Sequence, residues 1–260
     1  MRLWSSFLIA FSMYSRIPMP KADWKPENMR YSMCFFPLIG AVCGAFLAVW
    51  VMVCSVFSIG TILFSAVASL IGIFITGGIH LDGFCDTIDA LSSHRGKEEK
   101  LAILKDSHIG AFAVMGCVCY LLLSFGLWTE LKVEFSSVLV IAVEFIVSRA
   151  LSGLSVVCFP RAKTSGTLSA FSEASEKRKV VWCLSVYLVF CSVLVLGVAP
   201  ILGLVALFTS LVVFLCYRQI SLRQFGGITG DLAGWFLQIC EFSALAAMVF
   251  AQKVLEMIFS

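Results

Sequence analysis

The sequence predicts an all-α membrane protein, a polytopic transmembrane helical bundle of about seven spans plus an N-terminal interfacial or re-entrant helix. The 260-residue chain is 60% hydrophobic and 13% charged, with a mean hydropathy of +0.98, whereas soluble domains are about half apolar and a quarter charged. Its apolar residues gather in stretches of about 20, the length that crosses a bilayer as a helix. We expect residues 1–260 to form a single integral-membrane domain.

The first apolar stretch, residues 3–14, is interrupted by polar side chains and has no small-residue cleavage site after it. It therefore lacks the features of a cleavable signal peptide. Pro18 and Pro20 follow it closely and end it sharply. These features favour a helix at the membrane interface, or a re-entrant one, over a full span.

Seven longer apolar segments are predicted to cross the bilayer. They are residues 33–53, 55–76, 111–128, 136–158, 180–197, 200–217 and 230–251. We expect the first two to meet near Cys54 and Ser55, and the fifth and sixth to meet between Gly197 and Pro200. Because these turns are so short, each pair is predicted to be antiparallel neighbours.

The basic residues are distributed unevenly between the loops. Under seven spans the four longer loops fall on one side of the membrane. They are residues 1–32, 77–110, 159–179 and 218–229. Together they carry 16 of the 19 Lys and Arg residues, so the positive-inside rule places them in the cytoplasm. The net charge of +3 is too small to indicate a nucleic-acid partner.

Three aspartates, Asp82, Asp86 and Asp89, follow directly on the second apolar segment. Their spacing of four and then three residues places the carboxylates on one face of a helix. Like charges so arranged repel one another, and a hard divalent cation with oxygen ligands is the simplest reason for them. A solvated amphipathic helix with acidic residues near its start is the alternative.

Other polar residues fall on the same predicted side, and each has a plain structural alternative. His80 is either a base or phosphate contact or an ordinary interfacial histidine. Ser107 and His108 precede a span, where anion binding and simple helix capping are both reasonable. Arg149 lies within a span, as either a phosphate contact or half of an ion pair. Lys163 lies in a basic loop.

The final group is a glycine-rich turn, Gly226, Gly227 and Gly230, directly before Asp231. Backbone N–H groups beside a carboxylate suit a site for phosphate and metal. Together with the aspartates, these residues indicate an anionic substrate, a bound cation and a phosphoryl-type transfer.

Six ordered motifs give the chain a family resemblance. They are Ser15–Pro20, Phe36–Gly40, Thr76–Asp89, Asp106–Gly110, Ser148–Arg149 with Lys163 and Gly166, and Gly226–Asp231. In these motifs the chain resembles the cobalamin (5′-phosphate) synthase family, the adenosylcobinamide-GDP ribazoletransferases. His108 and Lys163 depart from the family pattern, where arginine is common at both positions.

The resemblance implies a magnesium-dependent enzyme of the bacterial inner membrane, with its active site facing the cytoplasm. It would join adenosylcobinamide-GDP to α-ribazole or α-ribazole 5′-phosphate, giving adenosylcobalamin or its 5′-phosphate and GMP. This is the nucleotide-loop assembly step of cobalamin biosynthesis. The partners implied are the two substrates and the lipid bilayer, and no nucleic acid. Whether the protein forms a homo-oligomer or a complex with other cobalamin-assembly enzymes is left open.

The resemblance also assigns roles to residues. Asp82, Asp86 and Asp89 would bind Mg²⁺, and Asp231 would be a further ligand or a base. Contacts to the pyrophosphate or the ribazole phosphate would come from Arg149, Lys163 and His108. Ser107 and the glycines of the Gly226–Asp231 turn would also bind substrate. His80 is the weaker candidate for activating the 5′-hydroxyl of the ribazole.

Two other functions deserve comparison. A CDP-alcohol phosphotransferase of phospholipid synthesis performs the same type of reaction with an aspartate-rich motif. This chain lacks the Ala-Arg pair that follows the first Asp-Gly in that group. A transporter should carry its acidic residues near the bilayer midplane on broken helices, whereas the aspartates here are predicted at the cytoplasmic edge.

Overall fold

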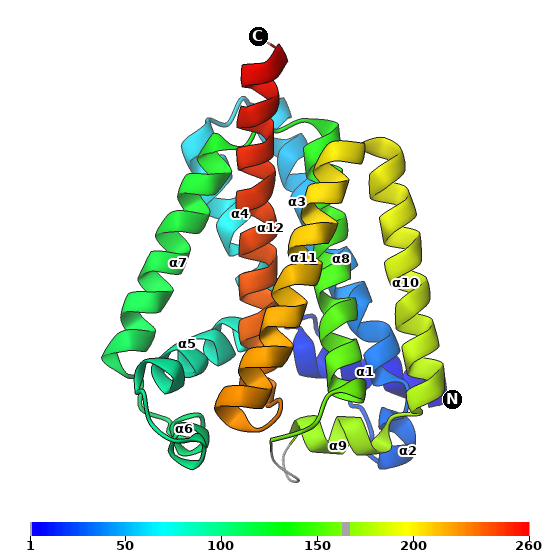
Figure 1. Ribbon diagram of the computed structural model, residues 1–260. Coiled ribbons are helices and arrows are strands. Elements are labelled where there is room, and N and C mark those ends of the chain that lie inside the picture. The colour runs from blue at the N-terminus through cyan, green and yellow to red at the C-terminus, as the bar shows by residue number, and fades with distance from the viewer. Residues whose placement is uncertain (1, 163–166, 260) are drawn as a thin grey trace.

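The computed structural model describes residues 2–162 and 167–259, and almost all of them are helical (Figure 1). The long helices are α3 (Ser32–Phe57), α4 (Thr61–Thr76), α7 (Ala111–Glu130), α8 (Phe135–Cys158), α10 (Lys177–Val198), α11 (Pro200–Ile220) and α12 (Gly230–Phe259). The shorter ones are α1 (Arg2–Tyr14), α2 (Pro26–Met29), α5 (Ile79–Ser92), α6 (Lys97–Ile103), α9 (Thr167–Ala174) and the π-helical turn η1 (Ser221–Phe225). The all-α prediction is confirmed.

Six helices of the described chain are long and apolar enough to cross a membrane on their own. They are α3, α7, α8, α10, α11 with η1, and α12. The remaining predicted span, residues 55–76, corresponds to α4, which has only 16 residues and passes the same test together with α5. The two helices meet at an angle of 97°. The prediction of about seven spans therefore holds, with one of them short and sharply bent.

The first interhelical turn lies later in the chain than predicted. Helix α3 continues to Phe57, and the chain turns through Ser58 and Gly60 before α4 starts. Ser58 has a left-handed φ of 52°, and its N–H donates to the carbonyl oxygen of Cys54. The apolar run shows no polar break at Cys54, so hydropathy alone could not locate this turn. The turn before Pro200, the first residue of α11, lies where the sequence predicts it.

The N-terminal helix α1 lies across the lower end of the bundle rather than along it (Figure 1). Its Ile9 and Ala10 are fully buried, whereas Leu3 and Trp4 are exposed. The backbone N–H of Arg16, just after the helix, donates to the carbonyl oxygen of Ile75 at 2.8 Å. This placement agrees with the interfacial alternative and fixes the N-terminal segment beside the end of α4.

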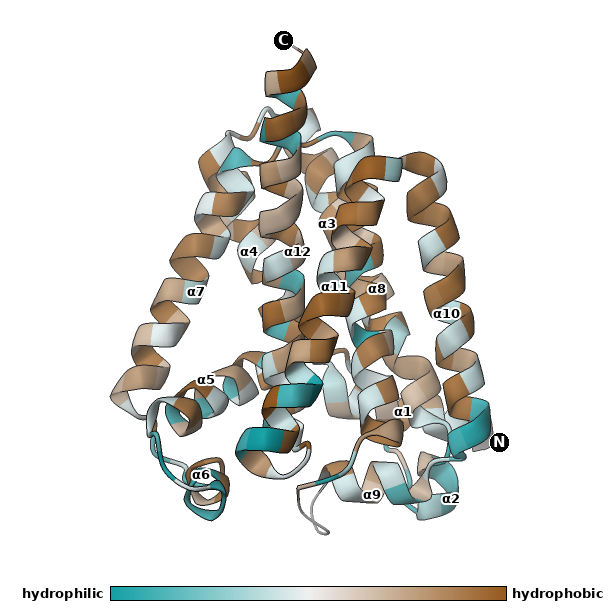
Figure 2. Cartoon of the chain, viewed as in Figure 1, coloured by the Kyte–Doolittle hydropathy of each residue, from teal (hydrophilic) through white to brown (hydrophobic). Residues whose placement is uncertain are grey.

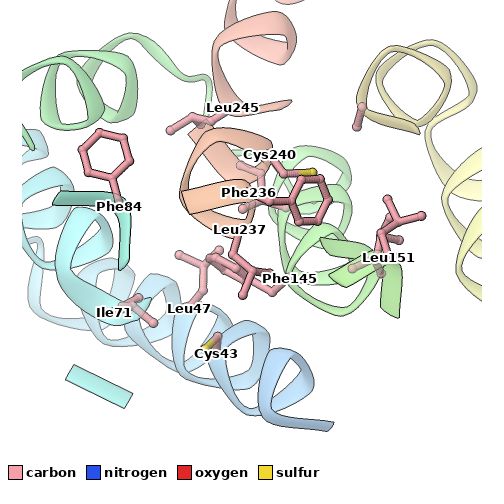
Figure 3. Close-up of a cluster of buried hydrophobic side chains, with 14 of the residues drawn as sticks. Cys43, Leu47, Ile71, Phe84, Phe145, Leu151, Phe236, Leu237, Cys240 and Leu245 are labelled. Carbon is pink, nitrogen blue, oxygen red and sulfur yellow. The ribbon is translucent and has the colours of Figure 1, made fainter. Parts of the chain in front are cut away.

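The hydrophilic parts of the chain gather at that same lower end (Figure 2). Helices α2, α5, α6 and α9 lie there (Figure 1), and the long helices above them are mostly apolar. The core of the bundle forms where α3, α4, α5, α8 and α12 meet, through side chains such as Leu47, Ile71, Phe145 and Phe236 (Figure 3). The core therefore holds α5, which carries the three aspartates, against the end of the membrane bundle.

Candidate active site

Two glycines turn the chain from α4 into α5. Gly77 and Gly78 both have a positive φ, 69° and 83°, a conformation that costs glycine little and other residues much. The turn produces the 97° bend, so α5 runs across the end of the bundle instead of continuing through it. The aspartates consequently lie at the edge of the apolar region, as the sequence predicts.

Helix α5 packs directly on the start of α12. A Cβ atom on Gly83 would lie 2.7 Å from the carbonyl oxygen of Asp231, so only glycine permits this approach. The opposite face of α5 is apolar, and Phe84 is buried against Tyr120 with ring centroids 5.2 Å apart. The crossing brings Asp231, distant in sequence, beside the aspartates of α5.

The carboxylates share one electrostatic environment. Asp82 is exposed and Asp86 is half-buried. Partial burial, followed by the negative charges of Asp82, Asp231 and Asp89 in that order, raises the pKa of Asp86 to about 6. Asp231 also accepts a weak hydrogen bond from the Thr229 hydroxyl at 3.4 Å. Repulsion of this kind is relieved by a bound cation.

Asp89 is used differently from the other two aspartates of α5. Its two carboxylate oxygens accept hydrogen bonds from the backbone N–H groups of Gly110 and Ala113, at 2.7 and 2.8 Å. Asp89 thus caps the first turn of α7 from a neighbouring helix. Helix capping from the loop before α7, one of the two roles that the sequence leaves open for Ser107 and its neighbours, is not observed, because Gly110 is the N-cap residue.

The described residues include no three His, Cys, Asp or Glu side chains close enough to enclose a metal ion by themselves. The donor set nevertheless suits Mg²⁺, which prefers oxygen ligands and usually binds to one or two carboxylates together with substrate phosphates. Asp82 and Asp86 are the residues of the cluster best placed for this. The sequence prediction that all three α5 aspartates are ligands stays a prediction, and Asp89 already has two backbone partners.

His80 lies at the start of α5 and is almost fully buried, at 4% exposure. Its ring lies beside the packed rings of Tyr14 and Phe36, with centroid distances of 6.2 and 5.9 Å. Burial, and to a lesser extent the positive charge of Arg149, lowers the pKa of His80 to about 3. The imidazole is therefore a weak base, which argues against the predicted activation of a hydroxyl by this side chain.

Two hollows adjoin the cluster. One is an apolar cavity of about 190 Å³, whose wall includes His80, Asp82 and Asp231. The other is an open cleft of about 350 Å³ beside Gly77 and Gly78, which Asp82 also lines. Asp82 is therefore accessible from both sides, and a substrate that spans the two hollows would pass over its carboxylate.

The glycine-rich turn before Asp231 pairs with the basic loop after α8. The N–H of Ile228 donates to the carbonyl oxygen of Pro160 at 2.8 Å, and the N–H of Ala162 donates back to Ile228 at 3.0 Å. Gly227 permits this pairing, because a Cβ there would lie 2.4 Å from the backbone of Arg161. The structure thus brings two predicted substrate-binding loops together. Lys163 lies outside the described residues.

The remaining predicted site residues lie in two separate loops, one before α12 and one before α7. Gly226, with a left-handed φ of 78°, ends η1, and Gly230 begins α12 beside the cluster. Ser107 and His108 are exposed in the loop before α7, where the His108 imidazole bonds the Asp106 carboxylate at 2.7 Å.

Arg149 is buried within α8, with 1% of its side chain exposed. Its guanidinium contacts the Glu241 carboxylate of α12 at 2.5 Å and the carbonyl oxygen of Phe145 at 2.9 Å. Glu144, on the same helix, accepts a hydrogen bond from the Ser210 hydroxyl instead of pairing with Arg149. These contacts favour the structural ion pair, one of the two roles that the sequence leaves open for Arg149.

Arg16 is a further cation of this region to which the sequence assigns no role. Its side chain lies against Gly77, where a Cβ atom would meet the Arg16 Nε at 2.8 Å. The residue is exposed, so the guanidinium is accessible beside the bend that leads to Asp82. The only signal in the sequence is its place in the Ser15–Pro20 motif, because nothing local indicates contact with residues 60 positions away.

Comparison with known proteins shows the family of the chain. The family described as cobalamin-5-phosphate synthase matches residues 6–249. An adenosylcobinamide-GDP ribazoletransferase of Lachnoclostridium phytofermentans is 46% identical over 255 residues, 98% of this chain and 97% of the relative. One of Geobacillus thermodenitrificans is 33% identical, over 91% of this chain and 92% of the relative. No solved structure matches the chain. The chain therefore belongs to the cobalamin-5-phosphate synthase family.

Proposed function

We propose that this protein is an adenosylcobinamide-GDP ribazoletransferase, which joins adenosylcobinamide-GDP to α-ribazole or its 5′-phosphate and releases GMP. The observation that carries the proposal is the 46% identity to a protein of that name over almost the whole of both chains. The carboxylate cluster at the edge of the bundle provides a site for the chemistry. The relatives' names do not favour the alternative of phospholipid synthesis.

The family description constrains which hydroxyl reacts. A product that keeps a 5′-phosphate, as the family description indicates, cannot have used the 5′-oxygen as the nucleophile. The prediction that the 5′-hydroxyl reacts is therefore replaced by attack from a secondary hydroxyl of the ribose. Its oxygen forms a bond to the phosphorus nearest the cobinamide, the bond from that phosphorus to the GMP oxygen breaks, and the hydroxyl proton is lost.

The residues of the cluster suit the donor's charged diphosphate. Asp82 and Asp86 would hold Mg²⁺, with Asp231 beside them and Asp89 fixing the adjacent helix. When bound, Mg²⁺ would neutralise charge on the diphosphate oxygens. Asp231 is the best placed carboxylate to accept the proton of the ribose hydroxyl, because it lies at the crossing of α5 and α12. Its role stays part of this proposal.

Arg16, Ser107 and His108 are proposed to contact the substrates. Arg16 beside the bend would contact the diphosphate, since a guanidinium can bind phosphate oxygens in a bidentate manner. His108 and Ser107 are exposed and accessible to either substrate. Arg149, in contrast, is engaged by Glu241. We therefore propose it as a residue that positions α8 against α12, not as a phosphate contact.

The proposed location is the bacterial inner membrane, with the site on the cytoplasmic side. The support for this orientation is the set of basic residues in the loops at the end of the bundle where α5 lies. Both substrates are charged or polar. They would therefore reach Asp82 from the water phase without crossing the bilayer.

The test is an assay of purified full-length protein in detergent with adenosylcobinamide-GDP, α-ribazole and MgCl₂. We expect GMP release that requires both α-ribazole and Mg²⁺, with one corrinoid product formed per GMP. CDP-diacylglycerol with an alcohol acceptor serves as the control donor. Release of CMP from that control, with no GMP from the cobinamide donor, would overturn the proposal in favour of phospholipid synthesis.

A further inference from the structure

The apolar cavity beside the aspartates is larger than the proposed phosphate chemistry requires. It has a volume of about 190 Å³ and lies where α1, α3, α5, α8, α9 and α12 meet. Its wall is mainly apolar and aromatic, with Tyr14, Phe36, Val156 and Leu237 among the lining residues. Asp82 and Asp231 belong to the same wall, so the cavity connects an apolar space with the carboxylates.

One polar atom of this wall has no partner. His80 Nε2 is buried and makes no hydrogen bond, although its ring packs beside those of Tyr14 and Phe36. Leaving a buried donor or acceptor unsatisfied costs roughly 1–3 kcal/mol, so such atoms usually have a function. The Tyr14 hydroxyl from α1 and the Ser152 hydroxyl from α8 are the uncharged polar groups that share this wall with His80.

The size and polarity of the cavity restrict its occupant. A cavity of about 150 Å³ lined by apolar side chains binds benzene, so one of about 190 Å³ admits a bicyclic aromatic ring. A corrin ring is several times too large. Guanine is small enough, but it carries several donors and acceptors that this wall would leave unpaired at high cost. A benzimidazole with one unsubstituted ring nitrogen matches both the apolar wall and the single unpaired Nε2.

We propose that this cavity binds the benzimidazole base of the acceptor nucleoside, with His80 Nε2–H donating a hydrogen bond to the free ring nitrogen. The inference rests on the proposed function for the identity of the acceptor. With the base in the cavity, the attached ribose lies toward Asp82 and Asp231. Burial of the base thus places the reacting hydroxyl beside the carboxylates and selects an apolar bicyclic base over a purine.

The test measures binding without catalysis. α-Ribazole is titrated by calorimetry into purified full-length protein in detergent, without Mg²⁺ and without donor. We expect binding that free dimethylbenzimidazole displaces and guanosine does not. His80→Leu should weaken it about tenfold, as the loss of one buried hydrogen bond predicts, whereas His80→Gln, which retains an N–H donor, should restore most of the affinity.

A second pair of variants tests the cavity itself. Val156→Phe adds volume on the cavity wall and should weaken α-ribazole binding at least about tenfold, whereas Leu154→Phe, on the same helix but not on the wall, should not. Thermal unfolding of each variant shows that it is folded.

Three results would overturn the inference: displacement by guanosine, equal affinity in His80→Leu and wild type, or equal affinity in Val156→Phe and wild type. The GMP-release assay on the same wild-type preparation distinguishes failure of the base-binding inference from failure of the proposed function. If the wild type releases GMP but His80→Leu and Val156→Phe bind α-ribazole as tightly as the wild type, only the base-binding inference is contradicted. Specific binding of α-ribazole without any turnover contradicts the proposed transfer reaction alone.

Discussion

Two charged regions of this protein differ in how their charge is compensated. Within the bundle, Arg149 and Glu241 form a nearly buried ion pair between α8 and α12. At the end of the bundle, Asp82 and Asp86 lie on α5 among other carboxylates, and the pKa of Asp86 is raised to about 6 by burial and then by its acidic neighbours. The difference indicates that the ion pair stabilises the fold, whereas the repulsion within the carboxylate cluster is consistent with the proposed binding of a cation.

The comparison extends to the second acidic residue in the bundle. Glu144 is buried and accepts a hydrogen bond from Ser210 at 2.5 Å. Partners of this kind are expected wherever ionisable residues enter a membrane protein's interior. The carboxylate cluster lies outside that environment, and no basic side chain is among the causes that shift the pKa of Asp86.

The largest expected effect is on catalysis. Asp82→Asn and Asp86→Asn should each lower the rate of GMP release by about a thousandfold or more, because the loss of a metal ligand removes several kcal/mol of transition-state stabilisation. The melting temperature should not fall, since both substitutions reduce repulsion. Asp23→Asn, an exposed carboxylate paired with Lys25, is the control. Full activity in both site variants would contradict the metal assignment.

The next largest effect is on stability, in the ion pair. Arg149→Met or Glu241→Leu alone should lower the free energy of unfolding by about 3–5 kcal/mol, because each leaves a buried charge without its partner. The double variant should be more stable than either single variant. Thermal unfolding in detergent measures this. An unchanged melting temperature in Arg149→Met, with a raised KM for the donor, would restore the phosphate-binding role for Arg149.

Substitution of Asp89 should affect both catalysis and stability, each less than in the variants above. Asn at this position keeps one acceptor oxygen but presents an NH₂ group to a backbone N–H of α7. Asp89→Asn should therefore cost about 1–3 kcal/mol of stability, unlike Asp82→Asn. If its melting temperature equals that of wild type while Mg²⁺ dependence is lost, Asp89 acts as a metal ligand and not as a cap.

The sequence predicted the helices and the acidic face but not the contacts between distant segments. Hydropathy located seven apolar segments, and the spacing of the aspartates on α5 predicted their shared face. The cap from Asp89 to α7 and the ion pair from Arg149 to Glu241 could not be predicted. Asp89 lies 21 positions from Gly110, and Arg149 lies 92 positions from Glu241. The geometry of both contacts depends on how whole helices pack. Arg16 was missed for the same reason.

The smallest expected effect concerns Arg16. Arg16→Gln should raise the KM for adenosylcobinamide-GDP about tenfold through the loss of one charge-assisted contact, with little change in kcat. Lys21→Gln, in the same N-terminal segment, is the matched control. An equal change in both variants would mean that Arg16 contributes only general positive charge.

Binding of Mn²⁺ in the presence of adenosylcobinamide-GDP, followed by electron paramagnetic resonance, compares the two regions most directly. The pair to compare is Asp86→Asn, at the end of the bundle, and Glu144→Gln, within it. We expect Asp86→Asn to weaken Mn²⁺ binding at least about tenfold and Glu144→Gln to leave it unchanged. Wild-type affinity in Asp86→Asn, with loss of binding in Glu144→Gln, would contradict the assignment of the metal site to the edge of the bundle.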